Sequence, residues 1–420
     1  MEKCVSAASS PSPEIKHGVD SAESTPQEGF FSPLIQSHTH WMNPICVDAL
    51  SCSMATLCFT ATPPLIPPNC STALCCHCCG RFLHHHHTST SLQDVKAQLI
   101  SVAQMPRQHL GDPEVMEMIL SQFKDHFCDL MMDQHCVFSI LAIFQASSVH
   151  QITRILHLLI QNHHKLKEVC MHNHGSVVIQ KLLEHLKTPE QICAAIFAVK
   201  RISVRLCKSI NGGHVINHCF KLFSPALTRF IIDEVANNCV EIATDKSGCS
   251  ILQKCLHHAK DNTMKRLIEE IVSHASVLTE HPFGNYAVQY IVKMKIPGVN
   301  AEIILQLQGC YAQLSMNKHA SNVVEHLLEF SEEKDAANII QELMYSHNFL
   351  RIIQDPYGNY VVQRALQNCK GSVYKMLSTI ILLNYPHLHT HPYGKRVLTF
   401  VQRRKNYEQR HISKQGGSSS

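Results

Sequence analysis

A six-residue segment returns seven times along the 420-residue chain at a nearly constant interval. The copies are "GSVVIQ" (175–180), "GGHVIN" (212–217), "GCSILQ" (248–253), "GNYAVQ" (284–289), "ASNVVE" (320–325), "GNYVVQ" (358–363) and "GKRVLT" (394–399). Their last residues are 37, 36, 36, 36, 38 and 36 residues apart. A fixed period of this length is typical of stacked supersecondary units, each of which buries its apolar face only against its neighbours.

Each unit has the apolar spacing of helices. In the sixth copy Tyr360, Val361, Val362, Ala365 and Leu366 lie at helical intervals. Prolines stand where helices start, as in "HP" (281–282), "DP" (355–356) and "DP" (112–113), and we expect the first helix near residue 112. The repeats therefore predict an all-α fold, a right-handed α-α superhelix in which one repeated helix lines the concave side. An eroded eighth copy is expected at "DQHCVFSIL" (133–141).

Composition divides the chain into a leader and a body. Residues 1–100 hold nine of the eighteen prolines and a net charge of −3, whereas the remaining residues carry +7. We expect residues 1–105 to form a disordered Pro/Ser/Cys/His-rich extension, 106–412 the helical-repeat domain and 413–420 a flexible tail. The body's charge is compatible with a polyanionic partner and does not by itself identify one.

The location of the chain is predicted from its apolar segments and its cysteines. The leader lacks an apolar signal region, and no stretch has eighteen uninterrupted apolar residues. We therefore expect an intracellular, cytoplasmic protein with no membrane partner. Cysteines at apparent core positions, such as Cys255 and Cys369, are expected to be reduced and to act as small buried hydrophobes.

Three places in the repeated segment carry polar or aromatic side chains. Counting from the residue after the opening Gly or Ala, these are places one, two and five, while places three and four stay apolar. Places one and five share a helix face and place two lies beside it. Each unit can therefore offer two hydrogen-bonding groups next to one group that stacks, which suits the reading of one planar base per unit.

These segments resemble the Pumilio (PUF) RNA-binding repeats over roughly residues 112–405, above all in the "HASNVVEHLL" unit (319–328). The resemblance implies a Pumilio/armadillo-like array that lies antiparallel along single-stranded RNA. It associates three pairs of residues at places one and five with bases. The pair Asn and Gln is associated with uracil, the pair Ser and Glu with guanine, and the pair Cys or Ser and Gln with adenine. A carboxylate such as Glu325 can accept from N1–H and N2–H of guanine, and an amide such as Gln363 can both donate to and accept from uracil.

Read from the C-terminal unit backward, the expected element is 5′-UGUANA in the 3′ untranslated regions of messenger RNAs. The expected RNA-contact residues are Ser176, Gln180, His214, Asn217, Cys249, Gln253, Asn285, Tyr286, Gln289, Ser321, Asn322, Glu325, Asn359, Tyr360, Gln363 and Arg396. For His214, an ordinary surface histidine and an RNA contact stay equally open.

Several units depart from the pattern. Gly213 has no side chain for an edge contact, and Val177 and Ser250 stand where the family often has a stacking arginine. In the eroded copy, Val137 and Leu141 occupy the edge places, so it is expected to pack rather than to read a base. The last unit (394–399), which includes Arg396, is expected to cap the array and attract phosphate.

The alternatives to RNA binding are an enzyme, a metal-binding protein and a protein-binding scaffold. No nucleotide-binding, hydrolase or zinc-protease motif is present, so we expect no catalytic residues and no cofactor. The "CCHCC" tract (75–79) lacks the separated ligand pairs of a structural zinc site, and no metal site is expected. The expected protein is a monomer that represses translation or promotes decay of messages by recruiting other proteins. The alternative is a protein-binding helical scaffold whose reading face has eroded.

Overall fold

The computed structural model describes residues 91–102, 104, 105 and 107–416, and every regular element within these residues is an α-helix. The described helices belong to one compact unit. The predicted disorder of residues 1–90, the "CCHCC" tract and the last residues of the predicted tail lie outside the described residues.

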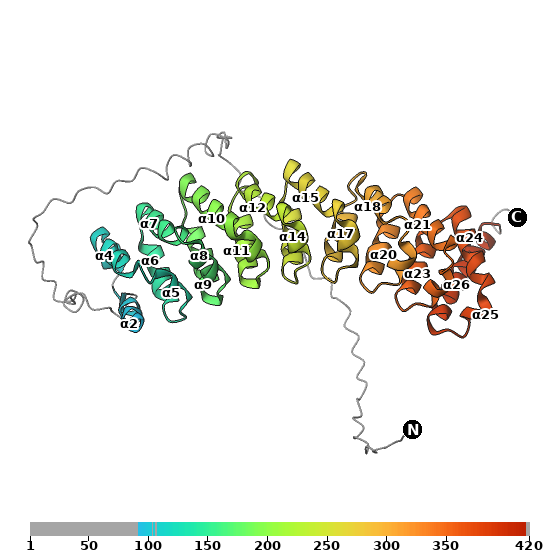
Figure 1. Ribbon diagram of the computed structural model, residues 1–420, viewed down its shortest axis with the longest axis horizontal. Coiled ribbons are helices and arrows are strands. Elements are labelled where there is room, and N and C mark those ends of the chain that lie inside the picture. Colours follow the sequence, from blue (N-terminus) through green and yellow to red (C-terminus); the bar gives the residue numbers. More distant parts are fainter. Residues whose placement is uncertain (1–90, 103, 106, 417–420) are drawn as a thin grey trace, which may run out of the picture. The chain divides into compact units, whose positions relative to one another are not determined.

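The helices form trios that repeat along the chain (Figure 1). Each trio has a short first helix, a middle helix that holds the repeated segment, and a third helix. The regular trios are α13 (Cys239–Ala243), α14 (Gly248–His258) and α15 (Asp261–Ser273); α16 (Ala275–Glu280), α17 (Asn285–Lys293) and α18 (Val299–Leu307); α19 (Tyr311–Ser315), α20 (Ala320–Phe330) and α21 (Glu333–Tyr345); and α22 (Phe349–Gln354), α23 (Gly358–Asn368) and α24 (Gly371–Leu383).

The trios nearer the N-terminus depart from this plan twice: the first has an 11-residue first helix and a 4-residue middle helix without the repeated segment, and two others share a helix. They comprise α2 (Leu92–Val102), α3 (Arg107–Leu110) and α4 (Pro113–Phe123); α5 (Phe127–Met132), α6 (Val137–Ala146) and α7 (Val149–Ile160); and α8 (His163–Met171), α9 (Asn173–Glu184), α10 (Pro189–Cys207), α11 (Ile210–Leu222) and α12 (Pro225–Asn237). The 19-residue α10 serves as the third helix of one trio and the first helix of the next. The array ends with α25 (Tyr385–Leu388) and α26 (Pro392–Gly416).

The turn before each middle helix is fixed by a polar side chain three residues ahead of the opening Gly or Ala. The Asp355 carboxylate accepts hydrogen bonds from the backbone N–H groups of Tyr357 and Gly358 at 2.8 and 2.9 Å. Gly358 itself is required by close approach, because an added Cβ would lie 2.4 Å from the carbonyl oxygen of Ile352 in the preceding helix. Such turns satisfy backbone donors that a helix start leaves without partners.

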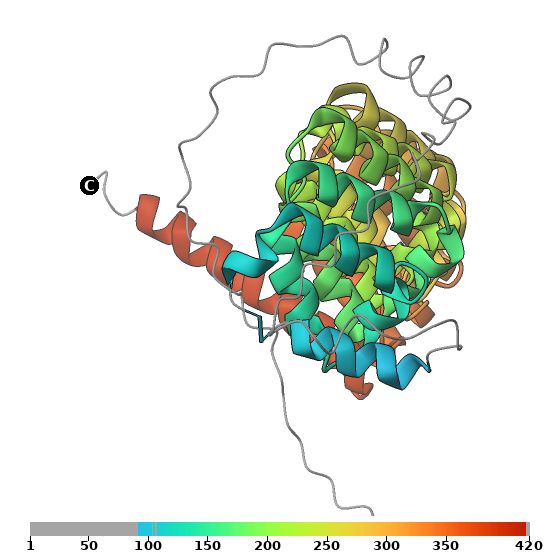
Figure 2. The same cartoon turned by 90° about the vertical axis from the view of Figure 1, so that its left-hand side faces the viewer.

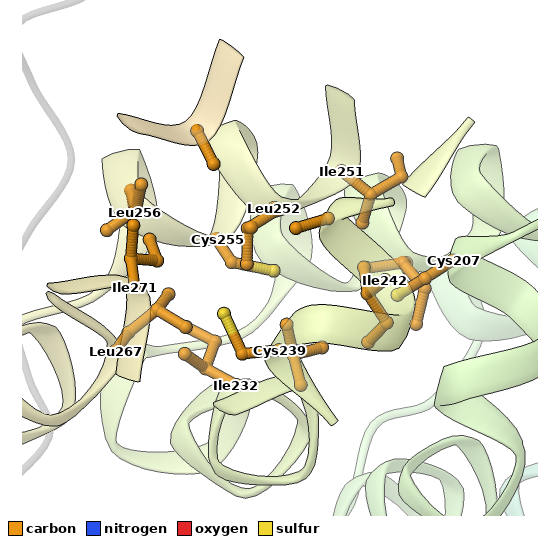
Figure 3. Close-up of a cluster of buried hydrophobic side chains, with 14 of the residues drawn as sticks. Cys207, Ile232, Cys239, Ile242, Ile251, Leu252, Cys255, Leu256, Leu267 and Ile271 are labelled. Carbon is orange, nitrogen blue, oxygen red and sulfur yellow. The ribbon is translucent and has the colours of Figure 1, made fainter. Parts of the chain in front are cut away.

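The apolar places of all three helices meet between the trios. Figure 3 shows this interior around α14, where Leu252, Cys255 and Leu256 point toward side chains of α12, α13 and α15. Cys255 and Cys369 are buried free thiols, as predicted, and burial raises the pKa of the Cys255 thiol well above its usual value. These cysteines therefore act as small core residues.

The middle helices pack against one another in a continuous row, in the order α6, α9, α11, α14, α17, α20, α23 and α26. Figure 2 views the unit from its α2–α4 end and shows the trios one behind another. Because each middle helix has the same orientation in its trio, equivalent places along the row face the same side. The predicted all-α repeat architecture is confirmed.

The structure has helical residues on both sides of the predicted domain boundaries at residues 105 and 413. Residues 92–102 form α2, whose Val95, Leu99 and Val102 are buried, and α26 continues to Gly416. A helix does begin at Pro113, capped by Asp112, but it is not the first of the array. The apolar residues of α2 are spaced by four and three residues, which indicates a helix. The average composition of residues 1–100 conceals this local pattern.

Candidate nucleic-acid interface

The three informative places of each middle helix differ in exposure. From α9 to α23 place one is buried, and Asn359 there is 0% exposed. Place two is exposed, with Tyr286 at 50% and Tyr360 at 46%. Place five is half-buried in every unit from α9 to α23. A planar ligand that lies along the row would therefore meet place two with its face and place five with its edge.

The two Asn/Gln units use place one to hold place five. Asn359 Nδ2 donates to the carbonyl oxygens of Asp355 and Pro356 at 2.9 and 3.0 Å, and its Oδ1 accepts from Gln363 Nε2 at 3.0 Å. In α17 the Oδ1 of Asn285 accepts from Gln289 Nε2 at 2.7 Å. The buried Asn thus anchors the Gln amide to the preceding turn, so that the Gln carbonyl faces away from this bond. Gln363 Nε2 also donates to the Asn359 carbonyl oxygen at 3.3 Å.

Where place one is Ser or Cys, its side chain bonds to the preceding turn and does not itself hold place five. Ser176 Oγ donates to the carbonyl oxygen of Asn173 at 3.1 Å, and Gln180 Nε2 donates to the Ser176 carbonyl oxygen at 3.1 Å. Cys249 Sγ donates to the Lys246 carbonyl oxygen at 3.4 Å, and Gln253 is half-buried beside it. A small side chain at place one leaves more room in front of the Gln than an Asn would.

The carboxylate of Glu325 lies in an electrostatic network that the sequence analysis missed. Arg364 Nε is 3.7 Å from Glu325 Oε2, and Arg364 Nη1 is 3.2 Å from Glu329 Oε2. Burial raises the pKa of the Glu325 carboxyl, while the Arg364 charge opposes that rise. Arg364 belongs to the next middle helix, directly after Gln363. This position is not one of the three places. A positive charge one repeat away from the Glu325 carboxylate could nevertheless have indicated the ion pair in the sequence.

The exposed groups at place two are not equivalent. Tyr360 Oη accepts a hydrogen bond from Arg396 Nη1 at 3.0 Å, and the Arg396 guanidinium lies over the Tyr393 ring at 5.4 Å from its centroid. This arrangement links the last unit of the row to the α23 unit. Asn322 is exposed but its amide donates to the carbonyl oxygens of Lys318 and His319 at 3.2 and 3.3 Å. Tyr286 and Tyr360 are thus the two large exposed faces among the predicted contacts.

The α11 unit is weaker for a structural reason. An added Cβ at Gly213 would lie 2.8 Å from Ile251 Cδ1 of the neighbouring middle helix, so the space of a place-one side chain is already filled. Asn217 at place five is half-buried, and His214 at place two is exposed. The unit therefore presents one short amide and one ring, but no anchored pair.

Comparisons with known proteins identify the family of this array. Six segments match the Pumilio-family RNA-binding repeat: residues 166–198, 204–236, 238–272, 274–293, 310–344 and 348–381. The chain belongs to the Pumilio (PUF) family.

Among its relatives, the Pumilio homolog 12 of Arabidopsis thaliana is 37% identical over 294 residues, which cover 70% of this chain and 49% of that protein. Pumilio homolog 9 of the same plant is 34% identical over 283 residues, covering 67% and 50%. The chain therefore spans about half the length of the curated relatives it matches.

Solved structures show the same architecture. The Puf4 RNA-binding domain bound to the HO endonuclease RNA 3′ UTR recognition sequence is 27% identical, with a TM-score of 0.58, over 73% of this chain and 94% of that one. The RNA-binding domain of yeast Puf5p bound to MFA2 RNA, at 23% identity and a TM-score of 0.61 over 74% and 98%, supports the fold alone. The array is thus a Puf-type helical-repeat superhelix. Among the described residues, none of the helices has the length and apolar character needed to cross a bilayer.

Proposed function

We propose that this chain binds single-stranded RNA with sequence specificity, one base per trio, and that its preferred element is 5′-UGUANA. The observation that carries the proposal is the recurrence, along one packed row of helices, of an exposed place two beside a half-buried, hydrogen-bonding place five. The Puf4 structure, whose description names an RNA 3′ UTR recognition sequence, supports the same class of ligand.

Each base is assigned by the chemistry of its unit. Gln363 and Gln289 are held by a neighbouring Asn, and each offers a carbonyl acceptor to N3–H of uracil. Gln289 keeps a second N–H for a uracil oxygen, and Gln363 gains one when a base displaces its 3.3 Å contact with the Asn359 carbonyl oxygen. Glu325 offers acceptors only, and guanine alone presents two adjacent donors. Gln253 and Gln180 lie beside Cys249 and Ser176, where the added space suits the larger adenine. The α11 unit accepts any base.

The direction of binding follows from the order of the units. With the 5′ end at α23, the RNA runs antiparallel to the chain, and Tyr360, Asn322, Tyr286, Ser250, His214 and Val177 supply the successive place-two groups. Stacking on tyrosine contributes about 1–3 kcal/mol per base, so the 5′ half of the element should dominate the affinity.

The biological role is proposed to be post-transcriptional. A monomeric, cytoplasmic array without chemistry of its own would hold the message at its 3′ untranslated region while recruited repressor or decay proteins act on it. No cofactor is required for this role.

The experiment is a fluorescence-anisotropy titration of the full chain with labelled 5′-UGUAAA and 5′-UCUAAA. Tighter binding of UGUAAA by at least tenfold is expected, because cytosine offers the Glu325 carboxylate only its amino group, beside the acceptor N3, where guanine offers two adjacent donors. The double variant Ser321→Asn with Glu325→Gln should change the preference at the second base from G to U. Equal, weak binding of both oligomers would instead favour a protein-binding scaffold.

A further inference from the structure

The α5–α7 trio, which precedes the segments matched to the family, has the full architecture of a reading unit. Asp133 accepts a hydrogen bond from the His135 N–H at 2.9 Å, and it stands three residues before Cys136, as Asp355 stands three residues before Gly358. Cys136 thus takes the place of the opening Gly. The helix α6 also packs against α9, so it extends the row of middle helices by one member.

This register assigns the places of α6. Ser139 and Ile140 are buried, as places three and four are in every other unit. Val137 at place one and Leu141 at place five are half-buried and have no hydrogen-bonding groups. Place two is Phe138, where the middle helices α9, α17 and α23 carry Val177, Tyr286 and Tyr360.

Phe138 is 79% exposed, the largest exposed fraction of any large hydrophobic side chain among the residues that the structure describes. The residues at its edge places predict that this unit only packs, but a ring that packs would be covered. Val177, at the same place on the adjacent helix α9, is 46% exposed. An aromatic face and an aliphatic face therefore stand side by side at the end of the row where the 3′ end of the RNA would lie.

We propose that Phe138 is a stacking platform for the nucleotide immediately 3′ of the UGUANA element, with Val177 on the other face of that base. The inference rests on the proposed RNA-binding function and extends its element to 5′-UGUANAN. In this proposal the eroded repeat binds a nucleotide instead of serving only to pack.

The chemistry of the edge places determines how this site treats different bases. Val137 and Leu141 can neither donate nor accept, so no Watson–Crick edge is favoured by a hydrogen bond, and the base must keep its polar edge toward water. Stacking on an aromatic ring tolerates all four bases, because every base has a π-face. The site should bind a nucleotide without reading it, with a modest preference for purines because their ring face is larger.

The test compares two labelled RNAs of equal length and charge, 5′-UGUAAAA and the same oligomer with an abasic nucleotide at the seventh position. Both retain the same phosphates, so the electrostatic contribution is matched. The full chain should bind the intact oligomer about fivefold or more tightly, the lower end of what one stacked base contributes. Oligomers with A, C, G or U at the seventh position should differ from one another by less than this factor.

Variants of the ring identify the group responsible. Phe138→Ala should abolish the difference between the intact and abasic oligomers, whereas Phe138→Tyr should retain it. The matched control is Leu305→Ala, which removes a 70% exposed side chain from the third helix α18 and should leave both affinities unchanged.

The outcomes separate this inference from the function on which it rests. If the chain prefers UGUAAA over UCUAAA but gains nothing from a seventh base, or if Phe138→Ala keeps the gain, the platform is refuted and the proposed function stands. If no oligomer is bound with sequence preference, both fail. The abasic comparison uses the unmodified chain, so it decides the question even if a variant does not fold.

Discussion

Replacing Arg364 by Met should change how recognition of guanine depends on pH. Arg364 Nε lies 3.7 Å from Glu325 Oε2, and the two side chains are 29% and 21% exposed. At this separation the attraction between unit charges is about 1 kcal/mol with the dielectric constant of water and about 4.5 kcal/mol with an effective value of 20. The true value lies between these limits because both groups are partly screened by solvent.

The direction of the effect follows from the two protonation states of Glu325. Burial already raises the pKa of this carboxyl above its usual 4.5, and Arg364 opposes the rise. Without the arginine the pKa rises further, and Glu329 adds to this as a nearby like charge. Only the ionised carboxylate accepts both guanine donors, so G recognition is present above the pKa and is lost as the pH falls through it. The loss should begin at a higher pH in the variant than in the wild type.

The magnitude is set by one charge-assisted hydrogen bond. Such a bond contributes about 1.5–3 kcal/mol, so protonation should reduce the preference for G by about tenfold to 150-fold. The assay is the ratio of the dissociation constants of UAUAAA and UGUAAA, measured between pH 8 and pH 5 for both proteins. Taking this ratio cancels pH effects on phosphate binding that the two oligomers share.

Two further titratable groups are close to the network. His326 lies on the same helix, its pKa is lowered by burial, and Lys293 on α17 also acts on it. Arg364 also lowers the pKa of His326, so the variant raises the pKa of this imidazole together with that of the Glu325 carboxyl. Arg351→Met, which removes an exposed arginine of α22, is the control and should behave as the wild type does. Ratios that follow the same pH curve in the Arg364→Met variant and the wild type would refute the role assigned to Arg364.

Two further predictions concern stability, measured by urea unfolding followed by circular dichroism. Leu252→Ala, at a fully buried site in the core of Figure 3, should lower the free energy of unfolding by about 2–5 kcal/mol, and an unchanged midpoint would contradict the packing described. Gly358→Ala should cost about 1–3 kcal/mol, because its Cβ would lie 2.4 Å from the Ile352 carbonyl oxygen. Ala320 occupies the same place in α20, so Ala320→Gly is the matched reverse variant. Its free energy of unfolding should fall by about 1 kcal/mol, because glycine has greater conformational freedom in the unfolded chain. A stabilised Gly358→Ala variant would refute the close approach.

The fold was predictable because its signal is repeated. A single Gly-Asn-Tyr segment is compatible with many structures, but seven copies at one period require equivalent environments, and the core positions follow from them. The predicted core burial of Cys255 and Cys369 is confirmed in the same way. The residues of α2 carry no such repeated segment, and their helix is recognised only from the spacing of Val95, Leu99 and Val102.

For the candidate site, the sequence predicts which positions of each repeat face a ligand, but not the contacts that their side chains make. The sequence separates places one, two and five, yet it does not indicate that Asn359 would be fully buried and would hold Gln363 rather than face a ligand. The role of Arg364 depends on the offset between adjacent helices, which is a property of packing. The exposure of Phe138 could not be predicted, because it lies in an apolar run and such a run predicts burial for all its members.

The fused helix α10 has a mechanical consequence for the array. Elsewhere, one trio passes to the next through a short turn that can absorb small changes in backbone angle. Between α9 and α11 the link is an uninterrupted 19-residue rod that carries its own hydrogen-bond ladder across the junction. Adjustments of pitch that fit the protein to nucleotides of different size should therefore concentrate in the other junctions, while the α10 junction stays stiff and keeps the units on either side of it in a constant relative orientation.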